Sequence, residues 1–376
     1  MRRALDNDLV QRYADYTGRD LSARRYQGNR YIEQIEHTAA DLAREVFHAS
    51  EVELRPISGH VAGAAVLLGL CQPGDVILEP GRDAGGHREG GKLTAGTAIP
   101  LKIQYLPFDA AHYNIDIPAA IRQIAETRPR AVILGSSNFL FPHPVAEIAA
   151  ALPPETILIY DASHVLGLIA AGRFQNPLAE GAHLVFGSTH KTLPGPQGGI
   201  IFSNRADLMD AACQAAYPAL VTNHHPFRIP ALALALLEMQ QWGADYADQV
   251  IANAQALGAA LRAAGVPCVG VDGCFSHSHT LLACVARFGK SAAVAQRLED
   301  AGIITTAAHL PEYWGTDGIR IGVQEITRMG ATLADMPHVA YWMAQAITGA
   351  RQADDIASEV REFMAGLGPV RFTWED

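Results

Sequence analysis

The chain of 376 residues predicts an α/β fold with a largely parallel sheet, followed by a smaller C-terminal domain of α+β type. The main observation is that short apolar runs alternate with segments of helical spacing, which is typical of strands and helices that build a parallel sheet. In addition, 49% of the residues are apolar and 18% are charged, which indicates a folded chain with a sizeable core.

Residues 1–50 are predicted to form a polar helical arm that is interrupted at residues 26–29. Within this arm, apolar residues recur at helical spacing from Ile32 to Phe47, so this stretch is expected to be an amphipathic helix. The arm ends where the first apolar run begins, and it is therefore treated as a unit of its own.

Residues 51–265 are predicted to form the large α/β domain. Its expected strands are the short apolar runs at 52–57, 75–78, 131–134, 156–160, 184–186 and 199–202. A helix is expected over residues 62–70, because Pro73 and Gly74 provide a stop signal just after it. Long helices rich in Ala and Leu are expected from about residue 206 to 265.

Residues 266–376 are predicted to form the smaller C-terminal domain. This part mixes apolar runs of strand length, at 281–285 and 318–321, with helical segments. The chain contains no internal repeat and no low-complexity tract, so two domains and an arm account for its length.

The composition narrows the class of protein. A net charge of −10 speaks against nucleic acid or an anionic membrane as a partner. The five cysteines show no CxxC spacing, which favours a reducing compartment over a disulfide framework. No signal peptide is visible, and no apolar run reaches the ~18 residues that span a bilayer. The expected location is the cytoplasm.

Lys191 is the strongest candidate for a catalytic group. It follows the apolar run 184–186, precedes a loop rich in Gly and Pro, and is one of only four lysines, the others being Lys92, Lys102 and Lys290. A buried strand rarely ends in a lysine that has no function. Burial disfavours the charged ammonium and frees the amine to form a Schiff base with a carbonyl compound. The alternative is a surface lysine in a turn.

Polar residues also follow other predicted strands. Asp161 follows the run 156–160, where a carboxylate can pair with the protonated ring nitrogen of a cofactor, although a helix-capping Asp is a common alternative. Ser58, Gly59 and His60 open a helix, and its first backbone N–H groups suit an anion. An ordinary N-cap serine would give the same pattern.

Three further sets of residues are candidates for binding a cofactor, a substrate or a metal. His87 follows two glycines and can lie flat on a planar ring, or it can be a solvated histidine in a turn. Arg320 lies inside an apolar strand and is expected to bind the carboxylate of a substrate, with a structural ion pair as the alternative. His277 and His279 share one face of a strand, but no nearby Cys, Asp or Glu completes a metal site, and no metal is predicted.

Together these motifs resemble the serine hydroxymethyltransferase family, which depends on pyridoxal 5'-phosphate, from about Leu9 to Gly330. The most specific element is Thr189-His190-Lys191-Thr192-Leu193 with the glycines that follow it. The stretches 161–172 and 318–322 also match the family's pattern. The resemblance implies fold type I of the pyridoxal phosphate enzymes, in which a mostly parallel seven-stranded sheet is sandwiched by helices.

The resemblance also implies a role for each site residue. Lys191 would form the Schiff base with the cofactor, Asp161 would pair with the pyridinium nitrogen, and His87 would stack on the ring. Arg320 would bind the substrate carboxylate. The remaining residues that the resemblance places at the cofactor are Ser58, Gly59, His60, Ser137, His164, Ser188 and His190.

The resemblance also implies that residues of the arm contribute to the active site of a second copy of the chain. Tyr13 and Tyr26 match two active-site tyrosines that the family supplies from the partner subunit, which implies a homodimer with shared active sites. Asp15 stands where the family has a catalytic glutamate, so the carboxylate is kept on a side chain that is one methylene shorter.

Three arginines depart from the family pattern. Arg25 stands in place of a tyrosine, and Arg82 and Arg88 stand where two leucines flank the folate ring in the family. These departures leave the use of tetrahydrofolate open, while the pyridoxal phosphate site matches the pattern.

The expected activity is aldol and retro-aldol chemistry at the Cα–Cβ bond, with glycine, serine, threonine or a related 3-hydroxy amino acid as substrate and an altered or absent folate site. The first alternative is a tetrahydrofolate-dependent serine and glycine hydroxymethyltransferase. Further alternatives are an aminotransferase and a protein that keeps the fold as a binding module without catalysis.

Overall fold

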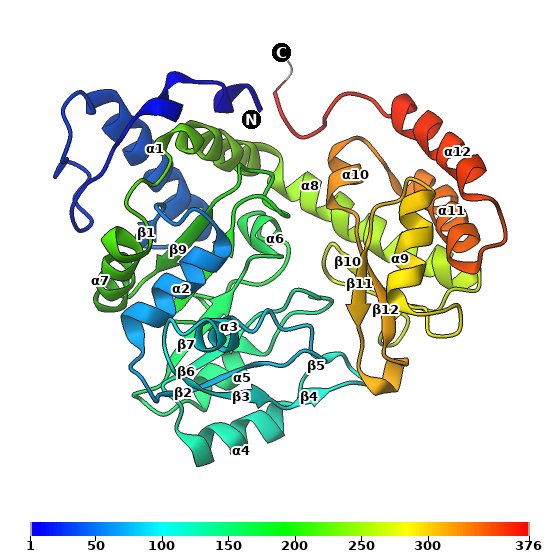
Figure 1. The fold of residues 1–376 in the computed structure, drawn as a ribbon, viewed down its shortest axis with the longest axis horizontal. Coiled ribbons are helices and arrows are strands. Elements are labelled where there is room, and N and C mark those ends of the chain that lie inside the picture. Colours follow the sequence, from blue (N-terminus) through cyan, green and yellow to red (C-terminus); the bar gives the residue numbers. More distant parts are fainter. Residues whose placement is uncertain (1, 375–376) are drawn as a thin grey trace.

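A seven-stranded sheet forms the centre of the computed structural model, which describes residues 2–374 (Figure 1). Its strands are β1 (Glu51–Glu53), β2 (Val76–Pro80), β3 (Lys102–Leu106), β6 (Ala131–Leu134), β7 (Ile157–Asp161), β8 (Leu184–Ser188) and β9 (Gly199–Ser203). Their order is β1-β9-β8-β7-β6-β2-β3. All neighbours from β8 to β3 are parallel, and only β9 runs antiparallel to its neighbours β8 and β1. The predicted mostly parallel α/β sheet is confirmed.

Helices cover both faces of this sheet. One face carries α2 (Gly59–Leu70), α3 (Glu89–Ala95) and α7 (Ala206–Gln214), and the other carries α1 (Arg30–Phe47), α4 (Ile117–Thr127), α5 (Val145–Ala150), α6 (Leu166–Ala170) and α8 (Ile229–Ala263). Along β7, Ile159 packs into one core and its neighbours Leu158 and Tyr160 pack into the other. Burial on both faces explains why these strands read as continuous apolar runs in the sequence.

A smaller antiparallel sheet forms the C-terminal part, as predicted. Its order is β10 (Thr280–Cys284), β12 (Asp317–Gly322) and β11 (Thr306–His309). The helices around it are α9 (Ser291–Asp300), α10 (Gln324–Arg328), α11 (Met336–Thr348) and α12 (Ala353–Gly366). The long helix α8 runs from the large sheet to this smaller one (Figure 1).

Short elements complete the described chain. They are the pair β4 (Phe108–Asp109) and β5 (Asn114–Ile115) and the helical turns η1 (Arg2–Leu5), η2 (Asp8–Gln11), η3 (Ala215–Leu220), η4 (Pro226–Arg228), η5 (Glu312–Trp314) and η6 (Leu333–Asp335). Within the described residues, all five cysteines are free. None of the described helices combines the length and the apolar character needed to cross a membrane.

The prediction of a helical arm over residues 1–50 is wrong for its first half. Only α1 is an α-helix, and the chain before it contains the two turns η1 and η2 and otherwise extended or bent backbone. Tertiary contacts hold this segment. Arg55 is almost fully buried, forms an ion pair with Glu53 at 2.5 Å and donates to the carbonyl oxygen of Gly18 at 2.9 Å. The Tyr16 ring lies 4.3 Å from the Arg55 guanidinium. These contacts, which no local pattern encodes, replace helical hydrogen bonds.

Candidate active site

Polar side chains gather at the carboxyl ends of the parallel strands, where open α/β sheets bind their ligands. Lys191 lies three residues beyond the end of β8, and its Nζ is 3.2 Å from Nε2 of His164, in the segment that follows β7. Because β7 and β8 are neighbours in the sheet, the two segments meet at the same edge. The sequence-based prediction that Lys191 and Asp161 lie near one edge therefore agrees with the topology.

Two buried threonines hold the Lys191 loop. Thr189 donates through Oγ1 to the carbonyl oxygen of Pro196 at 2.7 Å, which folds the Gly- and Pro-rich segment back on itself. Thr192 donates to the carbonyl oxygen of His164 at 2.9 Å and accepts from the Gly167 amide at 3.0 Å. Both threonines are fully buried. The backbone on either side of Lys191 is thus fixed, which orients its side chain.

The surroundings of Lys191 favour its neutral amine. Burial lowers the pKa of the Lys191 ammonium below its usual value, and the cations Arg320 and Lys92 act in the same direction, while Asp161 opposes them. A lowered pKa leaves a larger share of free amine near neutral pH, and the free amine is the form that attacks a carbonyl carbon. Lys191 is therefore suited to Schiff-base chemistry.

Asp161 is the last residue of β7, and its carboxylate is buried. Oδ1 accepts a hydrogen bond from the Ser163 amide at 2.9 Å, which fixes the carboxylate. Gly135, after β6, makes the close approach possible, since it has a φ of +135° and a Cβ there would lie 2.5 Å from the Asp161 carbonyl oxygen. A buried carboxylate at this edge can accept a hydrogen bond from a protonated ring nitrogen.

The N-terminus of α2 meets the end of β8 and forms a cradle. Ser58 caps the helix, because its hydroxyl accepts from the Val61 amide at 3.1 Å. A Cβ on Gly59 would lie 2.2 Å from Oγ of Ser188 and 3.0 Å from Oγ of Ser163, so this position is left open by the absence of a side chain. Helix N–H groups together with two hydroxyl groups suit an anion such as a phosphate. The contribution of Ser163 was not predicted from the sequence.

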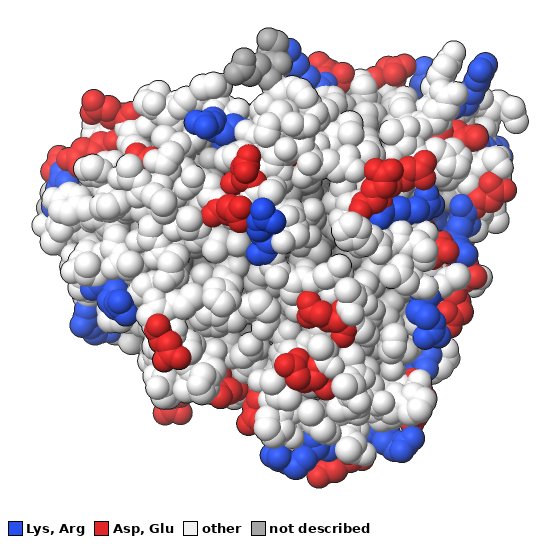
Figure 2. All heavy atoms as spheres, turned by 180° about the vertical axis from the view of Figure 1, so that it is seen from behind, with Lys and Arg blue, Asp and Glu red and all other residues white. Residues whose placement is uncertain are grey.

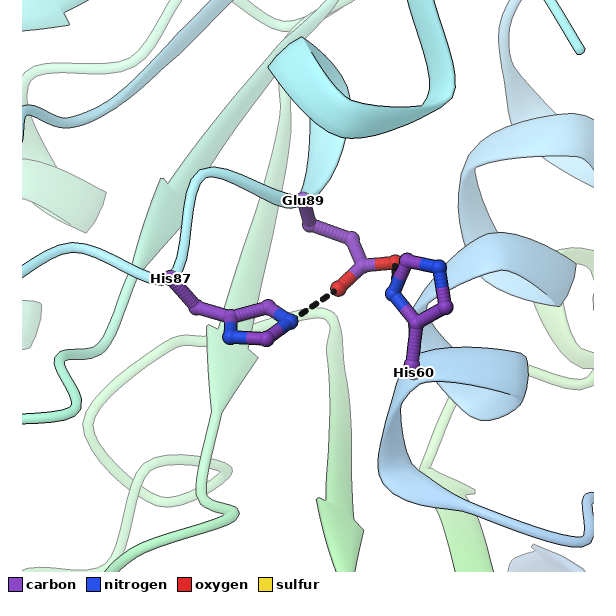
Figure 3. A group of neighbouring side chains, drawn as sticks. All are labelled: His60, His87 and Glu89. Carbon is purple, nitrogen blue, oxygen red and sulfur yellow. Dashed lines mark ion pairs between the residues drawn. The ribbon is translucent and has the colours of Figure 1, made fainter. Parts of the chain in front are cut away.

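His60 and His87 lie on either side of a buried carboxylate (Figure 3). Oε1 of Glu89 is 2.7 Å from Nδ1 of His60, and Oε2 is 3.3 Å from Nε2 of His87. The same nitrogen of His87, Nε2, also lies 3.0 Å from Nζ of Lys92. The sequence pointed to both histidines but not to Glu89 or Lys92, because α3, the helix that carries them, was not predicted.

Arg320, in β12, reaches from the smaller sheet to the edge of the large one. Its Nη1 donates to the carbonyl oxygen of Ser137 at 3.1 Å, and Ser137 follows β6. Among the described residues, no carboxylate forms an ion pair with Arg320, and burial lowers the pKa of its guanidinium. A partly buried cation without an acidic partner suits the carboxylate of a substrate.

His279 lies next to this site, although the sequence analysis did not place it there. Its ring stacks on that of His164 with centroids 6.0 Å apart and planes at 16°. Burial lowers the pKa of His279 to about 3 and, together with the nearby Lys191, lowers that of His164 well below its usual value. Both rings are therefore neutral near pH 7. The i, i+2 spacing of His277 and His279 was the available signal, and it does not reveal the long-range contact.

The arm residues form a separate cluster. The rings of Tyr13 and Tyr26 are 5.5 Å apart and both are exposed, and the Arg25 amide donates to the Asp15 carbonyl oxygen at 2.9 Å. Burial raises the pKa of the Asp15 carboxyl above its usual value. Within the described chain, the hydrogen bonds and ring contacts found for these residues do not involve Lys191.

His190, by contrast, adjoins Lys191 in sequence, and its side chain is exposed.

A hollow of about 310 Å³ lies at the opposite end of the strands, between the starts of β2 and β6. Arg128 forms an ion pair there with Glu155, and Arg130 donates to the carbonyl oxygen of Leu70 at 2.8 Å. Since its cations are paired and none of its lining residues carries the chemistry described above, the Lys191 edge remains the candidate active site.

Comparisons with known proteins point to one family. The family model described as serine hydroxymethyltransferase matches residues 3–343. The serine hydroxymethyltransferase of Methanopyrus kandleri is 40% identical over 382 residues, which cover 99% of this chain and 87% of that protein. The serine hydroxymethyltransferase of Aeropyrum pernix is 37% identical over 382 residues, which cover 100% of this chain and 86% of that protein. The structure of L-threonine transaldolase from Pseudomonas fluorescens in its internal aldimine state aligns with a TM-score of 0.93 at 29% identity, over 99% of this chain and 86% of that one.

Proposed function

The chain belongs to the serine hydroxymethyltransferase family of pyridoxal phosphate-dependent enzymes, and from this premise we propose that it catalyses reversible Cα–Cβ bond cleavage in small 3-hydroxy amino acids without tetrahydrofolate. Its substrates would be glycine plus an aldehyde in one direction, and serine, threonine or a related amino acid in the other. The observation that carries the proposal is the partly buried Lys191 amine, placed beside His164 at the edge where Asp161 lies.

The residues at this edge fit pyridoxal phosphate. The cradle between Gly59 and Ser188 suits the phosphate, the buried Asp161 suits the ring nitrogen, and Lys191 suits the aldehyde. His87 would lie against the face of the ring, and Ser58, His60, Ser137, His164 and His190 would surround it. When bound, the cofactor supplies an electron sink that stabilises negative charge at Cα of the substrate.

The protein's own residues have distinct tasks in this proposal. Arg320 binds the substrate carboxylate and thereby sets which bond at Cα faces the reacting groups. Asp161 keeps the ring nitrogen protonated, and Lys191 provides a free amine at neutral pH. The proton of the 3-hydroxyl group would be moved by His87 or by Asp15 of the partner subunit. Tyr13 and Tyr26 would complete the partner's site, so the working unit would be a homodimer.

The three arginines support a reaction that does not use folate. Arg82 and Arg88 are exposed, and neither forms an ion pair among the described residues. Guanidinium groups at positions where the family pattern has leucines are poor partners for a flat pterin ring and good partners for an anionic or larger aldehyde. The solved structure that this chain resembles at a TM-score of 0.93 is named as an L-threonine transaldolase, which supports transfer between an amino acid and an aldehyde.

A second candidate is tetrahydrofolate-dependent exchange between serine and glycine. It is favoured by the names of relatives that are up to 40% identical over nearly the whole chain. In this case tetrahydrofolate would bind next to the cofactor despite the arginines, and Arg25 would replace an aromatic contact.

A screen of 3-hydroxy amino acids with and without tetrahydrofolate tests the proposal, with aldehyde release as the measurement. We expect release without folate, and we expect the Lys191→Ala variant to lose at least ~10³-fold in rate because it lacks the nucleophile. Lys102→Ala, which changes an exposed lysine of β3, is the control and should behave as wild type. If serine is converted into glycine only with tetrahydrofolate, which takes up its Cβ carbon, or if glycine-loaded enzyme changes its visible spectrum strongly on adding tetrahydrofolate, the second candidate is correct.

Two remaining alternatives have their own signatures in the same experiment. An aminotransferase would convert the amino acid into a keto acid without releasing an aldehyde. A binding module without catalysis would be colourless and would take up no pyridoxal phosphate.

A further inference from the structure

We propose that Glu89 is a positioning residue that clamps His60 and His87 together and so sets how the cofactor is held. This inference rests on the proposed function, because it assigns a task within the same pyridoxal phosphate site. Glu89 connects two parts of that site, since His60 lies in the first turn of α2, beside the proposed phosphate cradle, and His87 lies on the loop that would cover the ring (Figure 3).

The burial of Glu89 is the first observation. The residue is 2% exposed, and both carboxylate oxygens are buried without any partner other than the two histidines. A buried carboxylate without a partner is strongly destabilising, so its surroundings must supply a proton donor or a cation. The imidazole nitrogens of His60 and His87, at 2.7 Å and 3.3 Å, are the groups that can do this.

The second observation is that the His87 ring also contacts a cation. Nζ of Lys92 lies 3.1 Å from Nδ1 and 3.0 Å from Nε2 of the ring. Lys92 and Glu89 are three residues apart on α3, so one short helix presents a cation and an anion to the same histidine. The ring of His87 therefore lies between the Glu89 carboxylate and the Lys92 ammonium, and these two groups together restrict the direction in which the ring points.

The third observation is that Glu89 is not needed to begin its own helix. Glu79, in β2, accepts from the amides of Gly90 and Gly91, each at 3.0 Å, and these bonds satisfy the start of α3. Helix α2 packs closely on the Glu89 carboxylate, because a Cβ on Gly63 would lie 2.9 Å from its Cδ. Glu79 therefore accepts the hydrogen bonds of the backbone at the start of α3, while the Glu89 carboxylate faces His60 and His87.

A divalent cation is the competing occupant of this cluster. The ligand atoms of His60, His87 and Glu89 all lie within 4.8 Å of one another, and two histidines with one carboxylate are a common ligand set. The Lys92 ammonium at 3.0 Å from Nε2 of His87 places a positive charge next to that position. The observations therefore favour the clamp, and metal analysis separates the two.

The test compares wild type with Glu89→Gln, an isosteric change that keeps the packing and removes the charge. The dissociation constant for pyridoxal phosphate is measured by titration of the apoprotein, and the circular dichroism of the bound cofactor reports the contacts around its ring. We expect Glu89→Gln to weaken binding at least ~10-fold and to change the dichroism band, since the histidines lose a charged hydrogen-bond partner. Lys92→Met should change the band in a similar way, because it removes the ammonium group beside the His87 ring.

Glu79→Gln is the matched control, because it changes a buried acid at the start of the same helix that contacts only backbone amides. It should lower the unfolding temperature of the apoprotein while leaving the dichroism band unchanged. The proposal is overturned if Glu89→Gln binds as wild type, if Glu79→Gln gives the same spectral change, or if wild type carries one equivalent of a divalent metal that Glu89→Gln lacks. A wild-type protein that takes up no pyridoxal phosphate would remove the proposed function itself.

Discussion

Lys191 illustrates how a single residue acquires its chemistry from its surroundings. Its position after an apolar run drew attention to it, but the low pKa follows from burial and from the charges around it. Asp161 raises this pKa, while Arg320 and Lys92 lower it, so the balance depends on residues contributed by three other segments of the chain. A lysine in a surface turn would have none of these neighbours.

The first prediction concerns the pH dependence of this amine. Only the deprotonated amine reacts with acylating reagents, so its reactivity rises with pH through the pKa. Because the pKa of Lys191 is lowered, we expect modification of Lys191 in the apoprotein to begin at a lower pH than modification of a lysine in an unstructured reference peptide. Asp161→Asn should move the rise to still lower pH, since the carboxylate supports the charged ammonium. Peptide mass spectrometry measures both rates.

The controls for this prediction lie in the same sample. The reference peptide reports the reagent's own dependence on pH, and circular dichroism checks that Asp161→Asn is folded. A Lys191 rate that rises together with the peptide would show that burial does not act on this amine.

At the scale of elements, the start of α2 is the feature on which the phosphate cradle depends. The helix begins at Gly59 after the Ser58 cap and packs against the end of β8. The sequence placed this helix correctly because the cap and the stop signal flank an apolar run. It did not show that the helix start touches Ser188, since that contact joins segments far apart in the chain.

The second prediction is that Gly59→Ala damages this junction. The added Cβ would lie 2.2 Å from Oγ of Ser188 and 3.0 Å from its amide nitrogen, so helix and strand must move apart. We expect a loss of about 1–3 kcal/mol in the free energy of unfolding of the apoprotein, from overpacking, and weaker binding of pyridoxal phosphate. Denaturant unfolding and cofactor titration measure the two effects.

Gly366→Ala provides a matched control for this substitution. Gly366 ends α12 and has nothing within 4 Å of a built Cβ, so alanine there should be neutral or slightly stabilising. Equal stability of Gly59→Ala and wild type would mean that the two elements have more room than the structure indicates.

At the scale of the whole molecule, exposed residues of the arm are candidates for contact with a second subunit. Tyr13 is exposed and its ring contacts that of Tyr26, and the ring contacts and hydrogen bonds found among the described residues do not join this pair to Lys191 of the same chain. Figure 2 shows a face on which acidic and basic side chains are scattered, with wide areas between them that carry no charge. Subunit interfaces are depleted of charged residues at their centres, so such a face is suited to a partner.

The third prediction tests shared sites by mixing two inactive variants. If Lys191 and Tyr13 of one active site come from different chains, Lys191→Ala and Tyr13→Ala should complement each other. Random reassociation would give hybrid dimers in which one site has both residues intact, restoring about a quarter of wild-type activity in a closed two-fold dimer. Aldehyde release after unfolding and refolding the mixture measures this recovery.

Each variant refolded alone is the control and should stay inactive. A mixture that recovers no activity, although each variant forms dimers by size-exclusion chromatography, would place both residues in the site of a single chain.

The sequence by itself determined the sheet and much of the site. Apolar runs that alternate with helices predict a parallel sheet, and the carboxyl ends of parallel strands meet at one edge, so Lys191 and Asp161 were expected at the same edge of the sheet. Only the tertiary structure decided that His279 stacks on His164, that Glu89 lies between His60 and His87, and that the chain before α1 is not helical. Local spacing governs hydrogen bonding within an element, whereas these features depend on packing between remote segments, and no short pattern in the sequence records that packing.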